Sequence, residues 1–226
     1  MTHPTLHAES SARLFGGQSS DWLPVHLYLD DTKKAFGDFR HRAFRHHEQG
    51  ALLCATSLAT DPAHQEKLYL VAEQHIREDC GGRLPTIEDW LDCFDVDGLG
   101  KLDKPVISTS VMNQLCAKRF NASPDEFAEI NDWIDGLDAS TRLTDSYHSA
   151  ARYLRHHSMG CFEVEEVFGR TMPLSNGHNI PTRYIAEYHN KVEFGYIPAA
   201  SEWASLIKHK IWMSRASFIR PMEALA

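Results

Sequence analysis

The chain of 226 residues contains one sequence pattern twice, and this internal duplication constrains its fold more than any other feature. The segment Phe44–Gly50 reads FRHHEQG and is echoed 110 residues later by LRHHSMG. Three more matches follow in the same order: Ala72–His75 with Ala186–His189, Leu84-Pro85 with Ile197-Pro198, and Trp90 with Trp203. Ordered self-similarity at a nearly constant spacing is typical of a tandem duplication. We therefore predict an N-terminal repeat unit over 1–94, a connector over 95–130 and a C-terminal repeat unit over 131–226.

Both copies show the periodicity of amphipathic helices. Residues at three- and four-residue steps form one face from Asp31 to Cys54 and again from Ala150 to Phe168, which predicts a long helix in each copy. In the second copy, Asn176-Gly177 separates two short extended segments and indicates a small β-hairpin. The predicted fold is mainly α, a pseudo-twofold pair of related helical units, and we expect the chain to act as a monomeric pseudo-dimer.

The composition argues against a nucleic-acid-binding protein and against a membrane protein. A formal net charge of −8, with only three arginines in the basic run 40–45, makes a nucleic-acid partner unlikely. No apolar stretch approaches the roughly 18 residues of a membrane helix, and no apolar signal segment opens the chain, so we expect a cytoplasmic protein without membrane contact. The five cysteines are scattered and include no C-x-x-C pair, which predicts buried thiols.

Histidine is the compositional outlier, with 14 residues. In the predicted long helices His47 and His157 lie in line with the apolar residues, whereas His46 and His156 lie one position toward the flank. An inward histidine needs a hydrogen bond or a metal at its ring nitrogens. The pattern leaves both explanations open.

A second helix in each copy favours the metal. His75 precedes Asp79 by four residues and His189 precedes Glu193 by four, so each pair points the same way. This spacing also occurs in surface pairs, but in a helical bundle it suits a divalent metal such as zinc, manganese or iron. The predicted metal ligands are His47, His75, Asp79, His157, His189 and Glu193.

Three further residues complete the predicted site. Glu165 lies near the inward face as a candidate proton acceptor, and Arg40 and Arg45 would hold an anionic group at the edge of a cleft. Together these features suggest a metal-dependent hydrolase of a phosphate ester or nucleotide, by fold-level analogy with histidine-aspartate phosphohydrolases. The chain has no histidine-aspartate doublet, which weakens that analogy. The alternative is a non-enzymatic phage or bacterial interaction protein with a protein partner, whose histidines pack helices or hold a structural metal.

Several short blocks resemble an uncharacterised family of short bacterial and phage proteins. They include His3-Pro4, His7-Ala8, Asp38–Ala43 and His46-His47 in the first half, and a later set made of Phe168-Gly169, Asn176-Gly177, Glu187, His189 and Gly195–Pro198. The resemblance carries no established activity. It implies that this chain is a fused double copy and that single-copy relatives pair as homodimers. Glu165 has Ala55 as its counterpart in the first copy, and His41 has Ala151 in the second, so the two sites are not equivalent.

Overall fold

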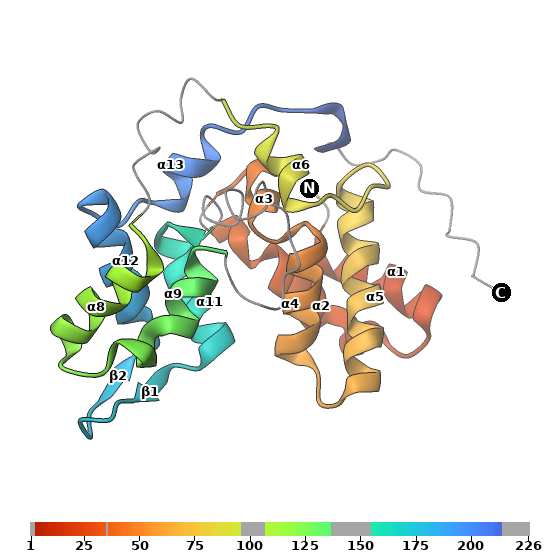
Figure 1. Ribbon diagram of the computed structural model, residues 1–226. Coiled ribbons are helices and arrows are strands. Elements are labelled where there is room, and N and C mark those ends of the chain that lie inside the picture. Colours follow the sequence, from red (N-terminus) through yellow and green to blue (C-terminus); the bar gives the residue numbers. More distant parts are fainter. Residues whose placement is uncertain (1–2, 35, 96–106, 137–154, 214–226) are drawn as a thin grey trace. The chain divides into compact units, whose positions relative to one another are not determined.

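The computed structural model describes residues 3–34, 36–95, 107–136 and 155–213, and it divides the chain into two compact units (Figure 1). The first, here called the N-terminal unit, contains 1–93 together with the segment from Ile207 onward. The second, the C-terminal unit, contains Phe94–Leu206. Residues 207–213 therefore belong to the unit in which the chain begins.

The elements described in the N-terminal unit are helices joined by short loops. Its longest helix, α5, begins after Asp61, whose side chain accepts a hydrogen bond from the His64 amide at 2.9 Å, and Pro62 occupies the first helical position. The elements are α1 (Pro4–Phe15), α2 (Ser19–Asp30), η1 (Asp31–Lys34), η2 (Phe39–His41), α3 (Arg42–Arg45), α4 (Glu48–Leu58), α5 (Pro62–Asp79), α6 (Ile87–Leu91) and η4 (Ile211–Met213).

The C-terminal unit is also helical and adds one small sheet. Strands β1 and β2 pair antiparallel, with Thr171 opposite Pro181, which confirms the hairpin predicted around Asn176-Gly177 and the mainly α class. The elements are α8 (Thr109–Phe120), η3 (Pro124–Phe127), α9 (Ala128–Ile134), α11 (Ser158–Phe168), β1 (Thr171–Pro173), β2 (Asn179–Pro181), α12 (Thr182–Phe194) and α13 (Ala200–Ala204).

The repeat extends further toward the start of each unit than the sequence matches indicated. The Gln18 amide donates to Asp21 at 2.8 Å at the start of α2, and the Ser123 amide donates to Glu126 at 2.7 Å at the start of η3, 105 residues later. Thus α8, η3 and α9 of the C-terminal unit correspond to α1 and α2. The structure differs here from the predicted boundaries, because 107–130 forms helices of the second unit rather than a connector. The rest of the predicted connector, 96–106, lies outside the described residues.

The helix predicted from Asp31 to Cys54 is wrong, because the chain turns sharply at His46. This residue has φ −94° and ψ 64°, and α4 starts only at Glu48 with His47 as its N-cap. The second copy does the same, since α11 starts at Ser158 with His157 as its N-cap. The predicted start of that helix, 150–154, lies outside the described residues. The two turns set the direction of the histidine side chains.

Candidate metal centres

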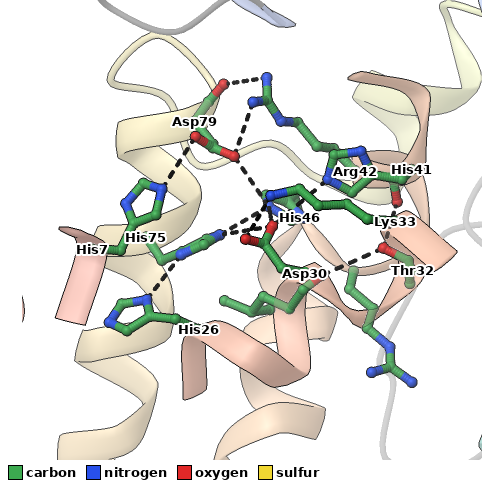
Figure 2. Close-up of polar contacts among 12 residues, drawn as sticks. His7, His26, Asp30, Thr32, Lys33, His41, Arg42, His46, His75 and Asp79 are labelled. Atoms are coloured by element: carbon green, nitrogen blue, oxygen red, sulfur yellow. Dashed lines mark hydrogen bonds and ion pairs between the residues drawn. The ribbon is translucent and has the colours of Figure 1, made fainter. Parts of the chain in front are cut away.

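Four buried side chains from separate parts of the N-terminal unit converge on one point (Figure 2). Asp30 ends α2, His46 lies in the turn between α3 and α4, and His75 and Asp79 lie one turn apart on α5. One ligand atom from each residue lies within 4.8 Å of all the others. We call Asp30, His46, His75 and Asp79 the N-terminal centre.

The distances in this centre suit ligands of a shared cation. His46 Nε2 lies 3.1 Å from His75 Nε2 and 3.6 Å from Asp79 Oδ2, while His75 Nε2 lies 3.7 Å from Asp30 Oδ1. The nitrogen–oxygen separations are too long for good hydrogen bonds. Ligand atoms about 2.1 Å from a tetrahedral ion would lie about 3.4 Å apart. The residues present therefore fit a divalent cation.

The C-terminal unit repeats this arrangement with Asp135, His156, His189 and Glu193, here called the C-terminal centre. His156 Nε2 lies 3.1 Å from His189 Nε2, 3.4 Å from Asp135 Oδ1 and 3.2 Å from Glu193 Oε2. All four residues are buried. Two related sets of two imidazoles and two carboxylates are therefore present in one chain.

Burial and the neighbouring charges set the protonation of the donors. Burial lowers the pKa of His46 and His75 in the first centre and of His189 in the second. Burial alone would raise the pKa of Asp79, but the neighbouring imidazoles of His46 and His7 outweigh it and hold that pKa well below its usual range. Neutral imidazole beside ionised carboxylate is the state in which these groups bind metals.

The pKa of His156 shifts in the opposite direction. Burial acts to lower it, but Asp135 and Glu193 favour the charged imidazolium and raise it. Binding of a cation in the C-terminal centre would therefore compete with a proton at His156.

Comparison with protein families supports the duplication. The family described as Domain of unknown function (DUF6915) matches residues 2–98 and again 109–213. The chain belongs to the DUF6915 family. The two matches confirm the predicted duplication and assign α8 to the second DUF6915 repeat, although the family description gives no activity. No curated protein and no solved structure matches the chain. In the described residues, no helix has both the length and the apolar character needed to cross a membrane.

Both DUF6915 repeats hold the first histidine of their centre in the same way. The indole of Trp90 donates to the carbonyl oxygen of His46, and that of Trp203 donates to the carbonyl oxygen of His156. The amide of Glu48 donates to the Pro85 carbonyl at 3.0 Å. The Ser158 amide donates to the Pro198 carbonyl at 2.8 Å in the second repeat. The matched Pro and Trp residues therefore support the turns that contain the histidines.

The structure brings together four of the six predicted ligands and places the other two elsewhere. His75, Asp79, His189 and Glu193 lie in the centres. His47 instead caps α4, accepting from the Gly50 amide at 3.1 Å, and His157 caps α11 in the same way at 3.2 Å. Because the helix is interrupted, the ligand positions belong to His46 and His156.

The predicted catalytic residues are not among the donors of either centre. Arg45 is buried, with its guanidinium 4.1 Å from the centre of the Tyr28 ring and a hydrogen bond to the Tyr28 carbonyl. Arg155 repeats this stacking on Trp133 at 4.0 Å. The Arg45 side chain is therefore part of the repeated scaffold.

Arg40 and Glu165 pair with other surface groups. Arg40 lies 3.6 Å from Asp38 and beside the ring of Phe39. Glu165 lies 3.9 Å from Arg183. The geometry thus gives no direct role at the centres to either side chain.

Sequence reasoning missed one carboxylate in each DUF6915 repeat. Asp30 is the last residue of α2 and Asp135 is the C-cap of α9, and each follows an aromatic and an aliphatic residue: Tyr28-Leu29-Asp30 and Trp133-Ile134-Asp135. This short match, 105 residues apart, was the available signal. It is weak as a sequence motif because most of each helix differs between the copies.

The repeats differ behind their second histidine. In the first, His75 Nδ1 lies 2.9 Å from His26 Nδ1, and His26 Nε2 lies 3.0 Å from the hydroxyl of Ser11. In the second, His189 Nδ1 lies 2.9 Å from the side-chain oxygen of Asn131. Each contact fixes the ring of a ligand histidine from behind, as outer groups do in metal sites.

Proposed function

We propose that the chain is a metal-dependent hydrolase that holds divalent cations in both units and acts on a small phosphate ester or nucleotide at the N-terminal centre. The observation that carries this proposal is the convergence of buried nitrogen and oxygen donors. Within the described part of the chain, Oδ1 of Asp30, Asp79 and Asp135 makes no hydrogen bond. Arg42 and Lys33 pair with the Oδ2 atoms of Asp79 and Asp30. Since an unpartnered buried carboxylate oxygen is costly, a cation at the shared point would stabilise the Oδ1 atoms.

The donor set narrows the choice of cation. Two imidazoles with two carboxylates suit zinc, manganese or iron. A divalent cation bound here supplies Lewis-acid activation of water and of a phosphoryl group. The two histidines and two carboxylates of the chain would hold and orient that cation.

The N-terminal centre also has cationic side chains at its edge. Arg42 lies 2.9 Å from Asp79 Oδ2, and Lys33 lies 2.6 Å from Asp30 Oδ2. The Lys33 side chain is 22% exposed, whereas those of Asp30 and Asp79 are 4% and 0% exposed. The centre therefore approaches the surface beside a cation. In this proposal Lys33 and Arg42 take the anion-binding role that the sequence suggested for Arg40 and Arg45.

The metal content of untagged protein purified without chelator tests the first step. We expect near-stoichiometric zinc, manganese or iron that falls in Asp79→Asn and again in Glu193→Gln, since each change removes one carboxylate ligand while keeping its shape. His64→Ala is the matched control, because His64 is a half-buried histidine at the start of α5 that belongs to neither centre. Folded protein that holds no metal and cannot be loaded would remove the basis of the proposal.

Hydrolysis is tested separately with metal-loaded protein and a panel of phosphomonoesters, phosphodiesters and nucleotides. We expect turnover that is lost in Asp79→Asn and retained in His64→Ala. Metal-loaded protein without turnover on any member of the panel would rule out the phosphohydrolase but leave the metal centres intact.

A second function is favoured by the closed surroundings of the C-terminal centre. Its four donors equal the ligand number of a structural zinc site, and their side chains are at most 4% exposed. A structural metal there would suit the alternative of a non-enzymatic interaction protein. Chelation that lowers the melting temperature, in a protein that shows no turnover, would favour this alternative.

A further inference from the structure

Two more histidines lie at the edges of the N-terminal centre (Figure 2). His7, from α1, has its Nε2 atom 3.5 Å from Asp79 Oδ1, and His41, from η2, has its Nε2 atom 3.7 Å from Asp30 Oδ1. His7 and His41 are 1% and 0% exposed, and neither Nε2 atom makes a hydrogen bond with the described residues. Both buried nitrogens therefore need a ligand or a proton acceptor.

Each of these rings is held from its other nitrogen. His7 Nδ1 lies 2.5 Å from the carboxylate of Glu78, and His41 Nδ1 donates to the carbonyl oxygen of Asp38. Histidines that bind metals usually donate their second ring N–H to a carboxylate or a backbone carbonyl, which leaves the other nitrogen for the metal. Both histidines have this arrangement, and in both the nitrogen left over is the one beside a carboxylate of the centre.

The ring contacts place His7 and His41 at different parts of the N-terminal centre. The ring of His7 lies beside that of His75, with centroids 4.2 Å apart. The ring of His41 lies beside that of His46, with centroids 5.5 Å apart. One carboxylate accompanies each pair, Asp79 beside His7 and Asp30 beside His41. His7 and His41 thus add one imidazole beside each carboxylate, while His46 Nε2 lies within 4 Å of both carboxylates, 3.6 Å from Asp79 and 3.9 Å from Asp30.

The second repeat has no histidine at the position that corresponds to His7. The residue 105 positions after His7 is Met112, which is buried in the apolar core of the C-terminal unit. The same offset relates Ser11, beside His26, to Cys116, whose Sγ accepts from the side-chain amide of Asn131 at 3.8 Å. The counterpart of His41, Ala151, lies outside the described residues and carries no ligand atom in its side chain.

We propose that the N-terminal centre binds two divalent cations, one held through His7 and Asp79 and the other through His41 and Asp30, with His46 and His75 completing the two ligand sets, while the C-terminal centre binds one. Two cations in this centre would share the carboxylates, as in two-metal sites where the ions are about 3.5–4 Å apart. The inference rests on the metal centres of the proposed function but not on hydrolysis. It predicts three cations per chain.

Native mass spectrometry and elemental analysis of Mn²⁺- or Zn²⁺-loaded protein count the cations. We expect three per chain in the unaltered protein and in His64→Ala, and two in His7→Met, which installs the side chain found at this position in the second repeat. His189→Ala should also retain two, both in the N-terminal centre. Two cations in the unaltered chain would overturn the inference and leave the proposed metal centres standing. None would overturn both.

Electron paramagnetic resonance of Mn²⁺-loaded protein gives a result that does not depend on any variant folding. Two Mn²⁺ ions that share carboxylates couple their spins, so the unaltered protein should show a coupled multiline signal beside the six-line signal of an isolated ion. Loss of the coupled signal in His7→Met, with helical circular dichroism retained, would complete the assignment. Isolated six-line signals alone would contradict it.

Discussion

The indole nitrogen of Trp90 donates a hydrogen bond to the carbonyl oxygen of His46 across 3.0 Å. His46 lies in the sharp turn before α4, so this bond fixes the backbone that presents a residue of the candidate N-terminal centre. Trp203 makes the same bond to His156 in the C-terminal unit, at 2.8 Å. The duplicated tryptophans therefore link the folding of each unit to the geometry of its centre.

Trp90→Phe should weaken the N-terminal centre and the fold together. The change removes the donor and leaves a buried carbonyl unsatisfied, which costs about 1–3 kcal/mol. Urea unfolding should show that loss, and metal titration should show weaker binding at the N-terminal centre only. Trp203→Phe is the matched variant and should affect the C-terminal centre. Unchanged metal binding in both variants would show that the tryptophan hydrogen bonds do not support the centres.

Gly50 should tolerate no side chain, because α4 passes directly over the preceding turn. A Cβ atom at Gly50 would overlap the carbonyl oxygen of Arg45, and one at Gly160 would overlap that of Arg155. Since backbone atoms must move to make room, Gly50→Ala should lower the free energy of unfolding by about 3 kcal/mol or more. Gly37→Ala is the control: no atom lies within 4 Å of its Cβ position, and the expected change is within about 0.5 kcal/mol. Equal unfolding curves for the two variants would contradict the close approach.

Replacing Arg45 should lower the free energy of unfolding more than replacing Arg40, because Arg45 is buried and Arg40 lies at the surface. Arg45→Ala removes a buried guanidinium that stacks on Tyr28 and bonds its carbonyl, so we expect a loss of about 2–3 kcal/mol in unfolding free energy. Arg40→Ala removes a half-exposed pair with Asp38 and should cost less than about 1 kcal/mol. Chemical denaturation of both variants makes the comparison. A stable Arg45→Ala protein that loses only substrate affinity would restore the anion-binding role predicted from the sequence.

The part of each centre that lies on one helix could be predicted from the sequence. His75 and Asp79 share an unbroken helix, so their four-residue spacing fixes their common direction before any tertiary contact forms. The same holds for His189 and Glu193 on α12. The duplication was equally visible, because its best-matched blocks retain identical residues.

The rest of each centre depends on backbone geometry and tertiary packing that periodicity does not encode. The choice between His46 and His47 depends on one turn, since uninterrupted helical periodicity directs His47 inward and the observed break directs His46 there instead. Asp30 comes from α2, far from the other donors in sequence, and only helix packing brings it to them. The correspondence of α1 with α8 was missed because the two helices share side chains of similar size at matching positions, such as Ser11 and Cys116, rather than identical residues.

Glu126 should give the C-terminal unit a pH-dependent contribution to stability. Its carboxylate accepts from the Ser175 hydroxyl and amide and from the Ser123 amide, each at 2.7 Å, and these bonds lower its pKa. A carboxyl group whose folded pKa is lowered stabilises the fold above its unfolded pKa of about 4.5, and the effect is lost as the pH falls through the folded value.

Glu126→Gln should therefore be less stable than the unaltered protein at pH 7, and the difference should shrink as the pH falls below 4.5. Urea unfolding at several pH values between 7 and 3 measures this difference. Glu129→Gln, an exposed glutamate on α9, is the control. A difference that stays constant over the whole range would contradict the assignment.

The five cysteines should be unreactive while the protein is folded. All are buried free thiols, and burial raises the pKa of Cys80 and Cys161 to about 12 and that of Cys93 and Cys116 to about 11. At pH 8 roughly one in a thousand or fewer of these four thiols would be thiolate, the form that reacts with Ellman's reagent, and Cys54 is 0% exposed. Labelling at that pH should therefore proceed only as fast as the fold opens, and urea should release all five thiols. If cations stabilise the units, chelator should accelerate labelling without urea. Rapid labelling of a native thiol would show that the packing around it is open.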